Sequence, residues 1–166
     1  MKIAFTGPEC SGKSTVSKAL AEQFQLPWVR EFAREYLEGL DRDYVTDDII
    51  TIAQHQYALW KEDTFIADTE MLVCSIWYEE KTGNRSDEIE SLLQAQEFDM
   101  YFLCKPDIPW EFDELRENSN DRERLFELYK TRLDEMELPY TVIEGNMEQR
   151  ATQAYDVIRN SIKNNH

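Results

Sequence analysis

The sequence predicts an α/β fold of three layers, in which helices cover both faces of a five-stranded parallel sheet. Two observations support this fold class. Short apolar runs, which are typical of buried strands, alternate along the chain with longer segments of helical periodicity. The first apolar run leads directly into a glycine-rich loop and then a helical segment, as at the start of a parallel strand–helix–strand unit.

The first half of the chain supplies three strands and three helices. A strand over 2–6 precedes a helix over 15–24, which Pro27 closes, and a short strand over 28–30 precedes a helix over 31–37 that stops near Gly39. The next helix, 47–61, is expected to have Thr46 as its N-cap and acids in its first turn. Its apolar face is interrupted only by Gln56, which we expect, like Gln54, at the surface. Residues 65–67 form a short buried strand.

The second half continues the alternation. A helix over 71–81 is closed by Gly83, and a shorter helix covers 86–96. Residues 100–104 are the clearest inner strand after the first, and Pro106 ends it. A charged, irregular stretch then leads to a helix through 136 that Asn120 or Asp121 caps. The last strand, 140–143, is broken by Gly145 and followed by a helix over 147–162.

Length and composition fit one globular domain over residues 1–166. The 166 residues lie within the ~100–200 of a typical domain. A hydrophobic content of 42% with 12% aromatic residues supports a packed core. No internal repeat or low-complexity linker divides the chain.

Charge and cysteine content narrow the partners and the compartment. The net charge of −16 disfavours a broad nucleic-acid or anionic-membrane surface, which needs clustered Lys and Arg. The three cysteines, Cys10, Cys74 and Cys104, are odd in number and predict reduced thiols. Residues 1–20 lack a leader pattern, and no segment has the ~20 apolar residues of a membrane span. We therefore expect a cytoplasmic protein, with its oligomeric state left open.

Residues 7–14 read Gly-Pro-Glu-Cys-Ser-Gly-Lys-Ser, the G-x-x-x-x-G-K-S pattern of a phosphate-binding P-loop. Its glycines let consecutive amides surround an anion at a helix N-terminus. Lys13 is expected to reach the β- and γ-phosphates of ATP, and the Ser14 hydroxyl to ligate Mg²⁺. The expected nucleotide-binding residues are Gly7, Glu9, Cys10, Ser11, Gly12, Lys13, Ser14 and Thr15.

Acidic residues follow two other predicted strands, at the sheet edge where ligands bind in this fold class. Asp68 is expected to hold Mg²⁺, directly or through water, or to orient an attacking hydroxyl. Its alternative role is the N-cap of the next helix. Glu31 is placed to act as a general base or to bind the substrate, and Glu35, one turn later, is the fallback. The alternative for Glu31 is a solvated acid at a helix start.

The segment 107–124 carries several arginines between a strand and a helix, and we interpret it as a lid. Arg116 and Arg122, ahead of Arg124, are expected to neutralise charge on the transferred phosphoryl group. Closure of a lid would also exclude water. The alternative is an ordinary charged connection whose arginines pair with nearby acids. Trp77 and Trp110 are candidates to stack on a substrate ring, with core packing as the alternative.

Several runs of residues resemble one known family. They are residues 7–15, the run Val-Arg-Glu-Phe-Ala-Arg-Glu-Tyr-Leu over 29–37, Ala-Asp-Thr over 67–69, and Pro109-Trp110 leading to Arg116. They resemble the ribosylnicotinamide kinase domain of bifunctional NAD-biosynthesis regulators and of stand-alone ATPase/kinases associated with NAD metabolism. The resemblance spans nearly the whole chain, and the run over 29–37 is far more specific than the phosphate loop.

The resemblance implies a P-loop nucleoside/nucleotide-kinase-like fold that transfers phosphate from ATP, with Mg²⁺, to nicotinamide riboside, giving nicotinamide mononucleotide. It implies phosphate and metal roles for Lys13 and Ser14, and a place for Asp68 at the 5′-hydroxyl or the metal. It also places Trp110 and the Arg116 region on the substrate side and in the lid. The chain departs from the family at Asp113-Glu114, where an Asp-Gly turn is expected, a change that would stiffen or reposition the lid.

Three functions remain open from the sequence. The first is a small-molecule kinase whose acceptor is nicotinamide riboside or another nucleoside. The second is an ATPase or nucleotide switch without an acceptor, although no Asn-Lys-x-Asp motif supports a GTPase. The third is a binding module without activity, which the intact loop and Asp68 disfavour.

Overall fold

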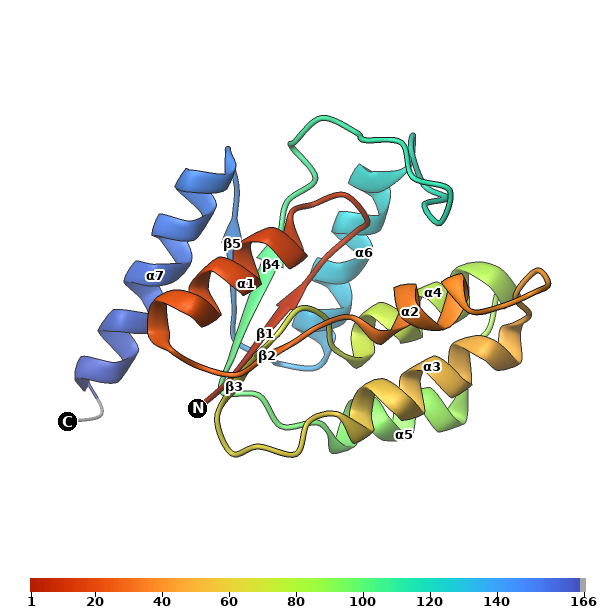
Figure 1. Ribbon diagram of the computed structural model, residues 1–166, viewed down its shortest axis with the longest axis horizontal. Coiled ribbons are helices and arrows are strands. Elements are labelled where there is room, and N and C mark those ends of the chain that lie inside the picture. Colours follow the sequence, from red (N-terminus) through yellow and green to blue (C-terminus); the bar gives the residue numbers. More distant parts are fainter. Residues whose placement is uncertain (165–166) are drawn as a thin grey trace.

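The structure is a computed structural model, and it describes residues 1–164. Its centre is a five-stranded sheet in the order β2-β3-β1-β4-β5, in which every paired neighbour is parallel (Figure 1). The strands are β1 (Lys2–Thr6), β2 (Trp28–Val29), β3 (Phe65–Ala67), β4 (Met100–Cys104) and β5 (Tyr140–Ile143). The predicted α/β fold with a five-stranded parallel sheet is confirmed.

Helices cover both faces of the sheet. One face packs against α1 and α7, and the other against α3, α4, α5 and α6, while α2 lies beyond the end of β2 (Figure 1). The helices are α1 (Lys13–Phe24), α2 (Phe32–Glu38), α3 (Thr46–Ala58), α4 (Met71–Thr82), α5 (Asp87–Ala95), α6 (Arg122–Glu135) and α7 (Met147–Asn164). No helix within residues 1–164 has the length and apolar character needed to cross a bilayer.

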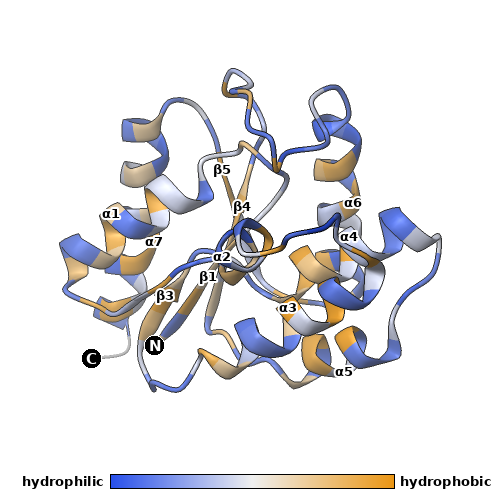
Figure 2. Ribbon diagram, turned by 45° about the vertical axis from the view of Figure 1, so that its right-hand side comes forward, coloured by the Kyte–Doolittle hydropathy of each residue, from blue (hydrophilic) through white to orange (hydrophobic). Residues whose placement is uncertain are grey.

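The two halves of the core follow from the alternation of side chains along each strand. In β1, Ile3 and Phe5 belong to the core under α1 and α7, whereas Ala4 between them belongs to the core under α3 to α6. In β4, Tyr101 and Leu103 face the second layer in the same way. Apolar residues accordingly concentrate in the strands and on the helix faces turned toward them (Figure 2).

The helix α3 departs from its prediction at both ends. It ends at Ala58 rather than near 61, because the amides of Leu59 and Trp60 bond three residues back and tighten the last turn. At its start, Val45 occupies the N-cap position, and the side chain of Asp48 accepts from the Val45 amide at 2.7 Å. Thr46 is therefore the first helical residue and not the cap.

The prediction that Gln56 lies at the surface is also wrong. Its side chain is 1% exposed and bonds to backbone groups outside α3. Its Oε1 accepts from the amide of Phe32 at 2.7 Å, and its Nε2 donates to the carbonyl of Arg30 at 3.3 Å. Gln56 thus satisfies backbone groups on either side of Glu31, at the start of α2. A polar residue on an apolar helix face is tolerated here because it has these partners.

The topology places the P-loop at the centre of the sheet. It follows β1, which pairs with β3 on one side and β4 on the other. The chain crosses to opposite sides of β1, so the carboxyl end of β1 is a switch point of the kind where α/β sheets bind ligands. The segment between β4 and α6 arches over this same edge (Figure 1).

Candidate functional site

The backbone of the P-loop explains why two of its positions are glycine. Gly7 has a φ of 131°, and a Cβ there would lie 2.7 Å from the Cys104 carbonyl oxygen in β4. Gly12 has a φ of 84°, and a Cβ there would meet the Met147 side chain at 2.7 Å. A side chain would be strained at both positions because of the positive φ. At Gly7 it would also meet the backbone of β4, whereas at Gly12 it would displace the flexible end of Met147.

Lys13 begins α1 and curls back over the loop. Its Nζ donates to the carbonyls of Gly7 at 2.8 Å and Pro8 at 2.7 Å. Ser14 and Thr15 are exposed in the first turn of α1, where helix amides have no intrahelical acceptor. This arrangement offers an ammonium, a hydroxyl and the positive end of a helix to an anion.

Asp68 follows β3 and is 3% exposed. Its Oδ1 is buried and has no hydrogen-bond partner within residues 1–164, and the same holds for the hydroxyl of Thr69. Burial raises the pKa of Asp68, an effect that Ser14 and Lys13 oppose. Asp68 does not cap α4, because Glu70 occupies the N-cap and accepts from the Leu72 amide at 2.8 Å.

These observations fit a magnesium site. Mg²⁺ is usually held by one or two protein oxygens together with phosphate oxygens and water. Asp68 offers a buried oxygen without a protein partner, and Ser14 offers an exposed hydroxyl on the adjoining helix. The residues present therefore match the predicted ligands, and their metal role stays a prediction.

Glu31 immediately precedes α2, and its carboxylate does not cap that helix. It is half-buried and makes no hydrogen bond or ion pair among the described residues. Burial raises the pKa of Glu31; Lys13 lowers it, and Asp68 raises it further. Glu31, Asp68 and Lys13 therefore lie close enough to influence one another's charge. Glu35 is exposed and pairs instead with Arg30.

The predicted lid, residues 107–124, follows β4, and its last three residues form the first turn of α6. Its two leading candidate arginines flank Trp110. The guanidinium carbons of Arg116 and Arg122 lie 5.9 Å and 5.5 Å from the centre of that ring. Arg122 donates to the carbonyl of Cys10 at 2.9 Å, and Arg116 to the carbonyl of Glu111 at 2.7 Å. Arg124 pairs with Glu80 and Asp121 and stands apart from this group.

The two candidate stacking residues have different surroundings. Trp77, half-buried in α4, donates from Nε1 to the hydroxyl of Tyr44 at 3.2 Å. The Tyr44 and Trp77 rings meet edge to face, 5.2 Å apart. Trp110 instead lies in the lid between two guanidinium groups. Their contact with a substrate stays a prediction.

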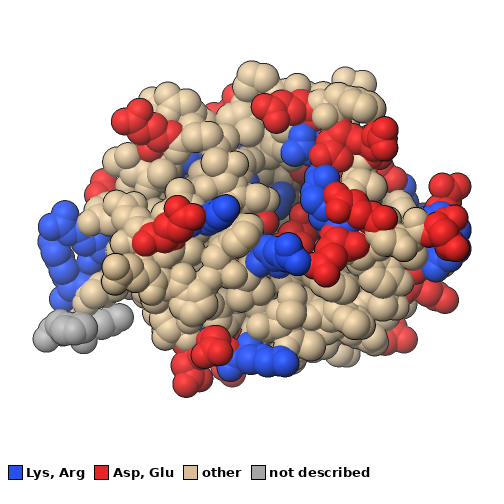
Figure 3. All heavy atoms as spheres, in the orientation of Figure 1, with Lys and Arg blue, Asp and Glu red and all other residues tan. Residues whose placement is uncertain are grey.

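Basic and acidic side chains gather around a hollow on this face of the molecule (Figure 3). The surroundings of the P-loop therefore carry charges of both signs. Positive charge is concentrated at the loop although the chain as a whole is strongly acidic, because Lys13 belongs to the loop and Arg122 reaches it from α6.

Arg150, which the sequence analysis did not single out, joins the P-loop to the far side of the sheet. It is fully buried in α7 and donates to the carbonyls of Ser11 at 3.1 Å, Lys105 at 2.8 Å and Gly145 at 2.6 Å. It also pairs with Asp107. A lone arginine in an amphipathic helix carries no sequence signal for such a role, since its partners Ser11, Lys105 and Asp107 are distant in the chain.

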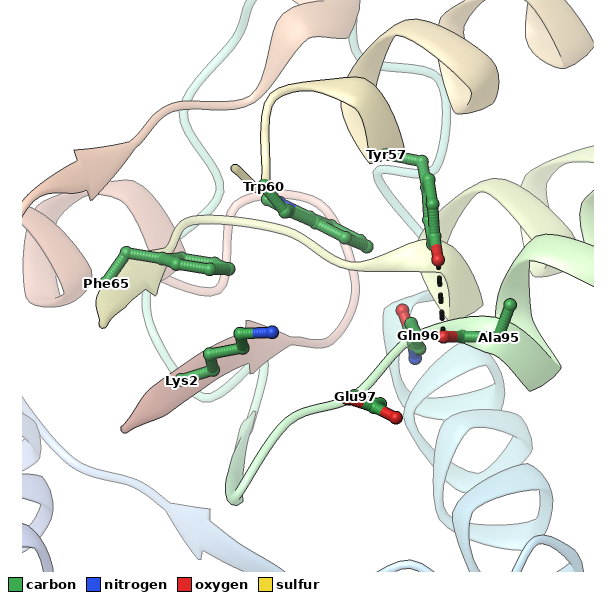
Figure 4. Close-up of a pocket in the computed structure, with 7 residues that line it drawn as sticks. All are labelled: Lys2, Tyr57, Trp60, Phe65, Ala95, Gln96 and Glu97. Atoms are coloured by element: carbon green, nitrogen blue, oxygen red, sulfur yellow. Dashed lines mark hydrogen bonds between the residues drawn. The ribbon is translucent and has the colours of Figure 1, made fainter. Parts of the chain in front are cut away.

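A cavity of about 270 Å³ lies away from the P-loop, at the opposite ends of the strands. The side chains of Lys2, Trp60 and Phe65 border it, together with those of Tyr57, Ala95, Gln96 and Glu97 (Figure 4). None of the predicted site residues lines it, so we do not assign it to the candidate site.

Known proteins resemble the chain over nearly its whole length. It is 24% identical over 170 residues to the trifunctional NAD biosynthesis/regulator protein NadR of Escherichia coli (strain K12), covering 95% of this chain and 42% of that protein. A crystal structure of NadR protein in complex with NR matches with a TM-score of 0.75 at 20% identity, over 96% of this chain and 50% of that one. Deoxyadenosine kinase from M. mycoides, with products dCMP and dCDP, matches with a TM-score of 0.65 at 16% identity, over 100% of both chains. The chain spans less than half the length of the curated relative.

These similarities confirm the predicted relationship to the NAD biosynthesis regulators and the P-loop kinase-like fold. A family model described as "AAA domain" matches residues 2–150, which include the P-loop, Glu31, Asp68, the lid and Arg150. Because this match extends over most of the chain, the protein belongs to that AAA domain family, as a member related to NadR.

Proposed function

We propose that the protein is an ATP- and Mg²⁺-dependent kinase that phosphorylates the hydroxyl of a small nucleoside, with nicotinamide riboside as the first candidate. The observation that carries the proposal is the placement of Glu31 and Asp68. Both carboxylates lie close enough to Lys13 of the P-loop for the charges to interact, and neither forms an ion pair within residues 1–164. An acceptor hydroxyl therefore has two acids available where the γ-phosphate would lie.

The residues divide the reaction between them. Lys13 and the amides at the start of α1 bind the phosphates, and Mg²⁺ supplies charge neutralisation when it is bound at Ser14 and Asp68. The acceptor oxygen forms a bond to the γ-phosphorus while the bond from that phosphorus to the bridging oxygen breaks, releasing ADP. Glu31 takes the proton of the acceptor hydroxyl, a role that its raised pKa favours.

The choice of nicotinamide riboside rests on likeness and charge. NadR was solved with NR, and a structural neighbour is a deoxynucleoside kinase, so nucleosides are the acceptor class to test first. The nicotinamide ring of the riboside carries a positive charge. Glu31 and Asp68 are neighbouring acids that favour a cationic acceptor over a neutral one.

The test is ADP release by the purified protein with Mg²⁺·ATP, measured across a panel of ribosides. We expect nicotinamide riboside to stimulate release and to yield its 5′-phosphate. Stimulation by another nucleoside alone would retain the kinase and change its substrate. If no riboside stimulates ADP release, the kinase proposal is wrong and an ATPase or switch is favoured.

The substitution Asp68→Asn tests whether Asp68 holds the metal ion or orients the acceptor hydroxyl. We expect transfer to fall at least about 100-fold, while binding of a fluorescent ATP analogue remains measurable because Lys13 and the loop are intact. The exposed Asp156→Asn in α7 removes the same charge far from the loop and is the matched control. Unchanged turnover of Asp68→Asn would remove Asp68 from the mechanism.

A further inference from the structure

The side chain of Glu9, within the P-loop, bonds to the far end of the lid. Its Oε2 accepts from the amide of Glu117 at 3.1 Å, from the amide of Asn118 at 3.0 Å, and from Nδ2 of Asn118 at 3.2 Å. Two successive amides that converge on one carboxylate oxygen form a small anion-binding concavity. The contact joins residues 108 and 109 positions apart in sequence.

This contact also compensates an unfavourable charge. A carboxylate in a loop that binds triphosphate would repel the ligand if it faced the phosphates. Three N–H donors instead direct the Glu9 charge away from the loop amides and partly compensate it. Glu9 thus contributes its backbone to the P-loop and its side chain to the lid.

The near end of the lid is attached to the next residue of the same loop. The Cys10 sulfur lies 3.5 Å from the carbonyl oxygen of Pro109 and 3.4 Å from the amide of Glu111. Glu9 and Cys10 therefore hold the two ends of the segment that carries Trp110 and Arg116. The middle of this segment is attached to α2 through Arg34, whose Nη2 lies 2.8 Å from Asp113.

Glu117 also contacts the helices on the other side of the site. Its carboxylate accepts from Lys81 of α4 at 2.8 Å and from the hydroxyl of Tyr44 at 3.0 Å. The end of the lid is thus held between the P-loop and the wall that contains Tyr44. The position of this end depends on Glu9, because Glu9 is the only P-loop side chain within residues 1–164 that bonds to its backbone.

We propose that Glu9 is a positioning residue that latches the lid, through the amides of Glu117 and Asn118, in the closed position over the P-loop. The latch keeps the Trp110–Arg116 segment at the phosphate site and limits the entry of water. The catalytic consequence of the latch rests on the proposed kinase function. The contact between Glu9 and the lid does not depend on that function.

Hydrogen–deuterium exchange of the protein free of nucleotide tests the latch without any turnover. In Glu9→Ala, we expect the amides of 117 and 118 to exchange about tenfold faster than in the unchanged protein. Glu9→Gln retains an acceptor oxygen without the charge and should exchange at an intermediate rate. The control is Glu114→Ala, which removes an exposed lid carboxylate that has no hydrogen bond or ion pair within residues 1–164.

A second variant, Asn118→Ala, removes the side-chain donor that the lid offers to Glu9. Asn118→Ala should also increase exchange at 117, and the double variant with Glu9→Ala should exchange no faster than Glu9→Ala alone, because both act on one contact. If the effects of the two substitutions multiply, or if Glu114→Ala increases exchange as much as Glu9→Ala, the latch is wrong.

Kinetic measurements can test the latch only after a riboside acceptor has been found. Glu9→Ala should then increase the ratio of acceptor-independent ATP hydrolysis to transfer, since an open lid admits water. Unchanged lid exchange together with a raised KM for the acceptor would show that Glu9 contacts the acceptor itself, and would overturn the latch. Faster exchange in a protein that no riboside stimulates would support the latch and reject the proposed kinase.

Discussion

At the scale of single residues, the candidate site depends on one buried and one half-buried carboxylate whose charges interact with Lys13. Asp68 was predicted from its place after a strand, and the structure shows it buried with an oxygen that lacks a protein partner within residues 1–164. Glu31 is half-buried, and burial raises its pKa above the ordinary value of 4.5. A carboxylate with a raised pKa accepts a proton more readily near neutral pH.

Glu31→Gln tests the general base. We expect turnover to fall by ~10²–10⁴-fold if Glu31 accepts the proton. The active form is the carboxylate, so activity of the unchanged protein should decline as the pH falls through the raised pKa of Glu31, at a pH above that of an ordinary glutamate. The pH–rate profile of the variant should lack this acid limb. Glu22→Gln, an exposed substitution in α1, should keep it.

Retained activity of Glu31→Gln with the same acid limb would contradict the base role. Loose transition states of phosphoryl transfer do not always need a protein base. In that case the limb would belong to another group, and Asp68, whose pKa is also raised by burial, would be the first to test.

At the scale of elements, α2 is positioned by α3 rather than by its own sequence. It has only seven residues, Phe32–Glu38, and none of them is fully buried. The side chain of Gln56 in α3 accepts from the first amide of α2 and donates to the Arg30 carbonyl. Glu31 lies between these two contacts, so the placement of the candidate base depends on a glutamine in another helix.

Gln56→Ala should leave the Phe32 amide and the Arg30 carbonyl without their partner. We expect a loss of about 1–3 kcal/mol in the free energy of unfolding, measured by urea denaturation. Transfer activity should fall as well, since Glu31 loses its support. Gln54→Ala, an exposed substitution in the same helix, is the matched control and should change the free energy by less than about 0.5 kcal/mol. Equal effects of the two variants would contradict the connector role.

At the scale of the whole molecule, the P-loop is held in place by residues from the second half of the chain. Gly7 rests against Cys104 in β4, and Gly12 against Met147 in α7. Arg150 joins the loop, the end of β4 and the end of β5 through carbonyl oxygens. The charge of this buried arginine is compensated by Asp107. The closing helix is therefore a structural part of the nucleotide site.

Arg150→Met should lower the free energy of unfolding by about 3–5 kcal/mol. It leaves the charge of Asp107 without its ion-pair partner, and it leaves the carbonyls of Ser11, Lys105 and Gly145 without the donor from Arg150. ATP binding should weaken in the fraction that still folds, since the Ser11 carbonyl loses its support. Arg159→Met, on the exposed side of the same helix, removes the same charge and is the control. Denaturation curves that shift equally in the two variants would show that Arg150 contributes no more than a surface charge.

The sequence by itself determined the sheet, the order of the helices, the P-loop and the strand-end position of Asp68. Each depends on neighbours in the chain: alternation marks strands, helical spacing marks helices, and the G-x-x-x-x-G-K-S pattern marks a strand–loop–helix junction. The relationship to the NAD regulators was also visible, because the run over 29–37 is local and specific. Helix ends were less accurate, as α3 shows, because tightened turns and caps depend on single bonds.

Only the tertiary structure decided which polar side chains are buried and what they bond. Gln56 was expected at the surface, Glu9 was expected only within the nucleotide loop, and Arg150 was not singled out. Gln56 bonds to a residue 24 positions away, Glu9 to one 108 positions away, and Arg150 to one 139 positions away in addition to nearer partners. Whether a polar residue on a helix is solvated, supports another helix or joins a loop to a lid depends on which donors and acceptors folding brings within hydrogen-bond distance. That proximity is a property of the packed chain and leaves no pattern in the residues beside it.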